Sequence, residues 1–367
     1  MKTMMTSKPD YRKAEREAYN LLELAGVSKL PVKVKKLKKH FPNLQIKTYT
    51  WYSKKWGITL EEVCDHADSD LGCCWYRKSL GKYIILYNDT IDNVGRIRWT
   101  IAHELGHFIL KHNEITNKSI IARSSLTEEE YEIFEKEANC FARTLLAPPP
   151  VITNLGKIDI YDIANICNIS FEAATHVMSF LIQGQQMGIV YTNRSKVADV
   201  FSDFIFKTKN THYCISCQKS FVYESPNFCP LCGLNNLIRT LGGEMNMIYP
   251  SIQLDENHRA VECPKCKNEN IIGDYCQICG SYLVNKCTGF TDEPGNRYEG
   301  SWHELNSGCG KLLSGESRFC IECGSTSTFY ESGLLSDWET EQKILAEEEI
   351  AASSDTTSDI DEDDLPF

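Results

Sequence analysis

The segment "TIAHELGHFILKH", residues 100–112, most restricts what this chain can fold into. On a helical wheel, His103, Glu104 and His107 share one polar sector, whereas apolar side chains occupy nearly all the rest. A helix of this composition is expected to be buried, and buried histidines beside a carboxylate need partners. The segment therefore predicts a core helix with one polar notch.

A zinc ion would satisfy the two histidines of the notch. Residues at i and i+4 lie one above the other on a helix, so both imidazoles can reach one ion at about 2.0–2.1 Å. Glu104 lies a little over a quarter-turn away, where it can take a proton from the attacking water and pass it to the leaving amine. His112 lies away from the notch, and we leave it out of the site. The alternative is a chance His-Glu-x-x-His in a core helix.

A hydrolytic zinc site needs a third protein ligand and leaves its fourth position to water. Leu110 and Asn113 stand where metzincins have glycine and histidine, which excludes that class. The next predicted helix offers Glu135 and Glu137, which both flank its apolar stripe. We favour Glu135, because Asn139 lies one turn further on the same side and can hydrogen-bond a ligating histidine. Glu137 is the alternative third ligand.

Two stretches, "RWTIAHELGHFIL" and "EKEANCFARTLLAPP", together resemble the ImmA/IrrE family of metallo-endopeptidases. The similarity covers about residues 10–190 and includes the "ISFEAA" helix pair. It implies a zincin-like, specifically gluzincin-like, peptidase in which His103, His107 and Glu135 bind the catalytic zinc. Glu104 would then be the general base. Members of this family act inside bacteria, often from mobile elements, and cleave or inactivate a helix-turn-helix transcriptional repressor.

Changes of composition divide the chain into domains, and the fold class they predict is α+β. Residues 1–190 form the ImmA/IrrE-like domain, whose helix-turn-helix-like pair at 158–185 we expect to pack on the core, because it is not basic. The remaining domains are predicted as zinc ribbon 1 at 191–240, a linker and zinc ribbon 2 at 241–283, zinc ribbon 3 at 284–330, and a disordered acidic tail at 331–367.

Local signals predict the elements of the first domain. The helices are expected at about 10–25, from a cap at Asp92 or Asn93 to about 111, and from a capping box at Thr127 to the prolines at 148–150. The strands are expected at 44–52, 71–77 and 83–88.

The acidity of the chain belongs to its end. Residues 331–367 hold thirteen Asp and Glu and one Lys, so subtracting −12 from the total net charge of −11 leaves +1 for residues 1–330. The body is therefore not a strongly basic nucleic-acid binder. Neither an apolar leader nor a run of some eighteen apolar residues occurs, so we expect a cytoplasmic protein without membrane contact.

Cysteine spacing predicts structural zinc in the second half. Of 17 cysteines, ten form Cys-x-x-Cys pairs, and two such pairs close a tetrahedral site of four thiolates. Ribbon 1 would use Cys214, Cys217, Cys229 and Cys232, and ribbon 2 would use Cys263, Cys266, Cys276 and Cys279. These sites leave no position for water, so they are structural. Because basic residues are not interleaved with aromatics, the ribbons favour protein over nucleic acid as partner.

A third ribbon is less regular. Cys309, Cys320 and Cys323 supply three ligands, and Cys287 would complete an all-thiolate set. His303 is the alternative fourth ligand, since the Cys287–Cys309 interval needs a long hairpin insertion. We thus expect one catalytic zinc and two or three structural ones.

The chain ends in "DIDEDDLPF", where Pro366 and Phe367 follow a run of carboxylates. This tip resembles the end of bacterial single-stranded-DNA-binding proteins, which docks on replication and repair partners. The alternative is an ordinary solvated tail. A rival function follows from the same features: a non-catalytic regulatory binding protein that acts through its ribbons and tail on DNA-repair or replication partners.

Overall fold

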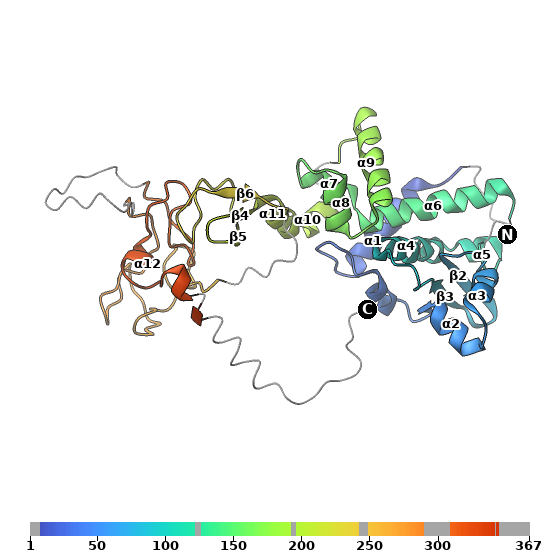
Figure 1. The fold of residues 1–367 in the computed structure, drawn as a ribbon, viewed down its shortest axis with the longest axis horizontal. Coiled ribbons are helices and arrows are strands. Elements are labelled where there is room, and N and C mark those ends of the chain that lie inside the picture. Colours follow the sequence, from blue (N-terminus) through green and yellow to red (C-terminus); the bar gives the residue numbers. More distant parts are fainter. Residues whose placement is uncertain are drawn as a thin grey trace. The chain divides into compact units, whose positions relative to one another are not determined.

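The structure is a computed structural model that describes residues 8–121, 126–191, 196–241, 249–289, 309–341 and 343–344. The chain divides into two compact units, Met1–Lys209 and Asn210–Phe367, and each is described by itself (Figure 1). None of the helices in the described ranges combines the length and the hydropathy that a membrane crossing requires.

Unit 1 mixes a small sheet with many helices. Its strands are β1 (Leu44–Thr48), β2 (Gly72–Arg77) and β3 (Lys82–Tyr87). Its α-helices are α1 (Tyr11–Leu24), α2 (Tyr49–Trp56), α3 (Leu60–Ala67), α4 (Val94–Leu110), α5 (His112–Thr116), α6 (Glu128–Leu146), α7 (Pro149–Asn154), α8 (Ile160–Cys167), α9 (Phe171–Gln186), α10 (Lys196–Val200) and α11 (Ser202–Asn210), the last ending one residue into unit 2. Two 3-10 helices, η1 (Val34–His40) and η2 (Lys78–Leu80), complete it.

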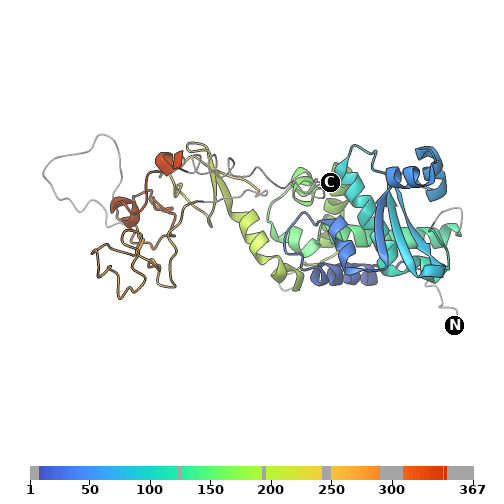
Figure 2. The same ribbon diagram turned by 90° about the horizontal axis from the view of Figure 1, so that it is seen from below.

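The sheet of unit 1 has the order β1-β3-β2 (Figure 2). β1 runs parallel to β3, whereas β2 pairs antiparallel with β3 and lies at the edge. Successive side chains point to opposite faces, so Tyr83 and Ile85 pack with α4 in the main core. Leu86 and Cys73 pack with α2 and α3 in a smaller cluster. Helices therefore cover both faces of the sheet.

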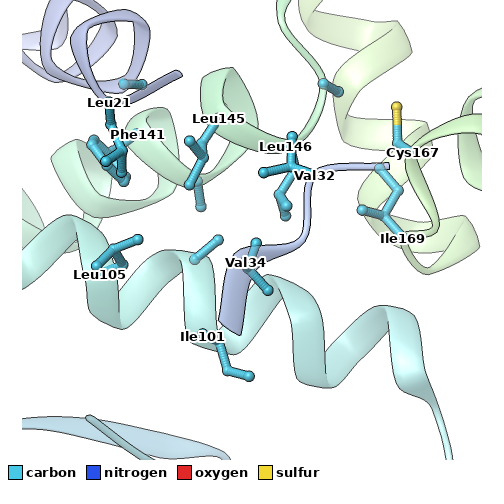
Figure 3. Packing of buried hydrophobic residues seen from close by; sticks show 14 of the residues in the cluster. Leu21, Val32, Val34, Ile101, Leu105, Phe141, Leu145, Leu146, Cys167 and Ile169 are labelled. Atoms are coloured by element: carbon cyan, nitrogen blue, oxygen red, sulfur yellow. The ribbon is translucent and has the colours of Figure 1, made fainter. Parts of the chain in front are cut away.

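The main core lies between α1, α4 and α6. Leu21 of α1, Leu105 of α4 and Phe141 of α6 are all buried and belong to one cluster (Figure 3). Burial of each such side chain contributes about 1.5–3 kcal/mol. The capping box predicted at Thr127 is present, and Asn93 caps α4 by accepting a hydrogen bond from the Arg96 backbone N–H. The helices that carry the candidate site are thus fixed at their starts as well as along their faces.

The strand predicted at 44–52 is too long. β1 ends at Thr48, whose side chain accepts a hydrogen bond from the Trp51 backbone N–H and so caps α2. Tyr49, Trp51 and Tyr52 are residues that favour strands, which explains the error. Gly57, with φ +67°, ends α2 in the left-handed conformation.

The helix pair α8–α9 packs against the beginning of α4, as expected for the segment 158–185. Arg98 of α4 donates through Nε to the carbonyl oxygen of Asn168 at 2.8 Å and through Nη2 to that of Cys167 at 3.3 Å. These carbonyls end α8, and Asn168 turns the chain with φ +49°. The pair is therefore joined to the domain core in this structure.

Unit 2 contains little regular structure in its described part. Its strands β4 (Thr211–Cys214), β5 (Lys219–Val222) and β6 (Leu237–Arg239) form an antiparallel sheet of order β5-β4-β6, and α12 spans Thr328–Glu331. The prediction that a disordered tail begins at residue 331 places its start too early. Leu335 and Trp338 are each only 7% exposed, and Glu341 forms an ion pair with buried Arg318 at 3.6 Å. An aromatic and an aliphatic anchor thus hold residues beyond 331 onto the unit.

We expect Gly95→Ala to destabilise unit 1, because its Cβ would lie 2.5 Å from the backbone of Ile169 and Ser170. The overpacking should cost about 1–3 kcal/mol, more than the helix propensity that alanine adds. The matched control is Gly184→Ala, whose Cβ would meet only the Tyr191 side chain, at 3.1 Å. Thermal melting should show a lower midpoint for the first variant alone. Equal midpoints would contradict this packing.

Candidate metal centre and active site

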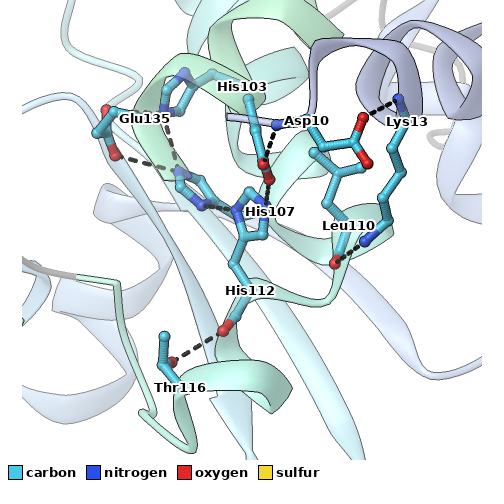
Figure 4. A network of polar contacts seen from close by, with 9 residues as sticks. Asp10, Lys13, His103, His107, Leu110, His112, Thr116 and Glu135 are labelled. Carbon is cyan, nitrogen blue, oxygen red and sulfur yellow. Dashed lines mark hydrogen bonds and ion pairs between the residues drawn. The ribbon is translucent and has the colours of Figure 1, made fainter. Parts of the chain in front are cut away.

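α4 and α6 cross closely at Gly106. A Cβ on this glycine would lie 3.2 Å from the Cα of Ala138 and 3.3 Å from its carbonyl oxygen. Two small residues thus let the helix backbones approach each other. As a consequence His103 and His107 of α4 face Glu135 of α6 across the crossing (Figure 4).

The three side chains place their ligand atoms around one point. Nε2 of His103 lies 3.1 Å from Nε2 of His107, and each nitrogen lies 3.3 Å from one oxygen of the Glu135 carboxylate. Ligand atoms about 2.0–2.1 Å from a tetrahedral zinc ion are themselves about 3.3 Å apart. The donor set and its spacing therefore fit a zinc ion, and the structure brings together the three residues predicted to hold it.

The charges of the three residues follow from their burial and mutual contacts. Burial alone would lower the pKa of His103, but the Glu135 carboxylate raises it to about 9. Burial lowers the pKa of His107 to about 3. Burial opposes ionisation of Glu135, yet hydrogen bonds from both histidines hold its pKa well below the usual range. Without metal, the site is thus an ion pair between protonated His103 and ionised Glu135.

Asn139, predicted to support a ligating histidine, lies beside His103. Its Oδ1 atom is 3.1 Å from Nδ1 of His103. An amide oxygen can only accept, so the Nδ1–H group of His103 donates to it. This leaves the Nε2 atom of the neutral ring with its lone pair toward Glu135, as metal ligation requires.

His107 has a different partner, which the sequence did not indicate. Its Nδ1 atom lies 2.9 Å from Nδ1 of His112, a residue with no exposed surface. Nε2 of His112 in turn lies 3.0 Å from Oε2 of Glu137. His112 therefore contacts a candidate ligand directly, whereas the helical wheel placed it away from the notch.

The prediction for His112 is wrong because α4 does not continue through it. Lys111 has φ +63°, which ends α4 and starts the short helix α5 at His112. The turn brings the imidazole back beneath His107, whereas a continuous helix would carry it away from the notch. No sequence pattern predicts a lysine in the left-handed conformation. The one available sign that His112 belongs to the site was a second acidic residue in the next helix, Glu137, which could pair with it.

Glu137, the alternative third ligand, faces His112 instead of the candidate metal position. Its Oε1 atom also accepts a hydrogen bond of 2.7 Å from the Asp10 backbone N–H. Burial opposes ionisation of this carboxyl, but the bonds from His112 and Asp10 hold its pKa below the usual value. The geometry therefore favours Glu135 over Glu137 as ligand.

Glu104 is buried next to the edge strand β2, with 8% of its surface exposed. Burial raises its pKa to about 7, while His103 and the backbone N–H of Cys74 act in the opposite direction. A carboxyl group with a pKa near neutrality is suited to accept and return a proton. A dication bound beside Glu104 would lower its pKa from this raised value.

The cysteines of unit 2 gather in three groups of four. Their members are Cys214, Cys217, Cys229 and Cys232; Cys263, Cys266, Cys276 and Cys279; and Cys287, Cys309, Cys320 and Cys323. The closest sulfur atoms within each group are 3.4–3.8 Å apart. This is much longer than a disulfide bond of about 2.05 Å and close to the spacing of thiolates about 2.3 Å from a shared zinc ion.

The fourth member of the third group is Cys287. Cys287 lies 3.4 Å from Cys323, sulfur to sulfur, and belongs to the group. His303, the alternative ligand, lies outside the described residues, as do Pro366 and Phe367 of the predicted docking tip.

A comparison with protein families gives a match within unit 1. Residues 57–179 match the IrrE N-terminal-like domain, Peptidase_M78. This part of the chain is an M78 peptidase domain. The resemblance to the ImmA/IrrE family and the α+β fold class are thereby confirmed. A comparison with curated proteins gives no match to the chain. The M78 match contains His103, His107 and Glu135, whereas α1, which carries part of the network around His112, precedes it.

We expect metal binding at the M78 site to weaken as pH falls below about 9, because the proton on His103 competes with the ion. Below that pH, the affinity should fall about tenfold per pH unit, the behaviour of one competing proton. Calorimetric zinc titration of protein whose cysteine groups are already loaded should show about one proton released from His103 at pH 7 and a further fraction of a proton from Glu104. An affinity independent of pH between 6 and 8 would contradict the ion-pair description.

Removal of zinc should unfold unit 2 and spare unit 1. Each of the three hydrophobic clusters in the described part of unit 2 is built partly from the cysteines themselves, as Cys263, Cys229 and Cys320 illustrate. Unit 1 has a large core of its own. Hydrogen exchange after chelation should therefore show lost protection in the described residues of unit 2 only, restored by added zinc. Retained protection would contradict a structural role for metal.

Proposed function

We propose that this chain is a zinc-dependent endopeptidase, with His103, His107 and Glu135 as zinc ligands and Glu104 as general base. The observation that supports this most strongly is the convergence of two imidazoles and one carboxylate from α4 and α6, with a second, buried carboxylate beside them. The match of residues 57–179 to the M78 peptidase domain supports the same reaction class.

A zinc ion bound here supplies Lewis-acid polarisation of the scissile carbonyl and of the attacking water. Glu104 accepts a proton from that water as oxygen attacks the carbonyl carbon. The same carboxyl group then delivers the proton to the peptide nitrogen as the C–N bond breaks, so Glu104 ends unprotonated. His103 and His107 keep their Nε2 lone pairs toward the ion because their Nδ1 atoms are hydrogen-bonded to Asn139 and His112.

The substrate we propose is a helix-turn-helix repressor or another regulatory protein of a bacterial or mobile-element stress response, acted on in the cytoplasm. The resemblance to ImmA/IrrE peptidases supports this substrate. The three cysteine groups would each hold one structural zinc, because four thiolates leave no position open to water, giving four zinc ions in all. The ribbons of unit 2 would contact the protein partner.

We expect Glu104→Gln to abolish proteolysis while zinc stays bound. Loss of a general base typically costs about 10²–10⁴ in rate, and glutamine cannot accept the proton. Wild-type and variant genes would be expressed in the cells of origin, and new protein N-termini would be identified by mass spectrometry. Cuts that occur with wild type alone would establish the peptidase and identify its substrate.

The matched control is Glu129→Gln, an exposed carboxylate in the first turn of α6, which should leave every cut unchanged. Cuts that persist in Glu104→Gln would exclude Glu104 as base. The same N-termini in all strains, with zinc bound at His103, His107 and Glu135, would instead favour the non-catalytic binding protein.

A further inference from the structure

A continuous hydrogen-bonded chain runs from the candidate metal ligand His107 to the beginning of α1. It passes from Nδ1 of His107 to Nδ1 of His112 at 2.9 Å, and from Nε2 of His112 to Glu137 at 3.0 Å. Glu137 accepts its last bond, of 2.7 Å, from the Asp10 backbone N–H. His112 has no exposed surface, and the Phe134 ring packs against it with 4.6 Å between ring centroids. Water is therefore excluded from the middle of the chain.

Only one arrangement of protons satisfies this chain when His107 binds a metal. Nε2 of His107 must then keep its lone pair for the ion, so Nδ1 carries the proton. The Nδ1 atom of His112 must accept that proton's hydrogen bond, which places the proton of His112 on Nε2. That N–H group donates to Glu137, an ionised acceptor. The tautomers of both rings are thus determined by the carboxylate at the far end.

The two histidine ligands are therefore supported unequally. His103 is backed by the neutral amide of Asn139, whereas His107 is backed by a carboxylate acting through a second imidazole. A partner with negative charge makes the ligating nitrogen a better electron donor and restricts rotation of its ring.

The far end of the chain is held by α1, which lies before the M78 match. The Asp10 side chain caps α1 by accepting from the Lys13 backbone N–H at 2.9 Å, which holds the Asp10 backbone in position. Lys13 also donates through Nζ to the Leu110 carbonyl oxygen at 3.4 Å, next to the turn that places His112 (Figure 4). The turn between α4 and α5 and the Glu137 side chain are thereby both hydrogen-bonded to the start of α1.

We propose that His112 and Glu137 are positioning residues that set the tautomer and ring orientation of His107 and so raise the zinc affinity of the site. This inference rests on the proposed function, because it takes His107 as a zinc ligand. The residues act through His107 and contact neither substrate nor metal.

The test compares zinc retention in full-length wild type, His112→Phe and Glu137→Gln. Zinc would be removed by graded chelator, with the cysteine groups remaining loaded, and the ion lost from the M78 site would be counted by mass spectrometry. We expect this ion to be bound about 10–100-fold more weakly in both variants. His176→Asn, an exposed histidine of α9, is the control and should retain zinc as wild type does.

A second readout reports the chain itself. Nuclear magnetic resonance of protein labelled with ¹⁵N in histidine should show a protected Nδ1–H proton of His107 in zinc-loaded wild type. It should be lost in His112→Phe and shifted in Glu137→Gln. Glu137→Gln preserves the side-chain shape, so it decides the question where His112→Phe fails to fold.

The outcomes separate the two proposals. Wild-type zinc affinity in a folded Glu137→Gln variant, with an unshifted His107 proton, would overturn the positioning role and leave the proposed function intact. Failure of the wild-type protein to bind zinc at His103, His107 and Glu135 would overturn the proposed function instead.

Discussion

The close crossing of α4 and α6 at Gly106 and Ala138 is the contact on which the site depends. It brings two imidazoles and a carboxylate within coordination distance of one point, and it buries Glu104 beside them. Each of these groups would be costly to bury alone. Gathered at the crossing, they neutralise one another without metal and form a fitting donor set for zinc.

Burial also explains why the histidine ligands need hydrogen-bond partners of their own. A histidine ligand is useful only in the tautomer that presents its lone pair to the ion, and in a dry site water cannot set that tautomer. Asn139 does so for His103, and His112 with Glu137 does so for His107. Leu105 of α4 and Phe141 of α6 are fully buried in one cluster, so the two helices that carry the ligands are packed together.

Much of this organisation could be predicted from the sequence, because periodicity and capping act locally. The wheel of residues 100–112 indicated the buried notch, and the capping box at Thr127 indicated the start of α6. The errors arose where a long-range contact or a rare backbone conformation determines the structure. Thr48 ends a strand although the residues after it favour strands. Lys111 adopts a left-handed conformation that returns His112 to the site, and Trp338 anchors a segment whose composition suggested a free tail.

The most direct test of the account is anomalous diffraction at the zinc edge from crystals of the zinc-loaded chain. We expect a peak about 2.0–2.2 Å from Nε2 of His103, Nε2 of His107 and the Glu135 carboxylate, with the remaining position open to water. Absence of a peak there, or a fourth protein ligand that closes the site, would contradict a hydrolytic zinc centre.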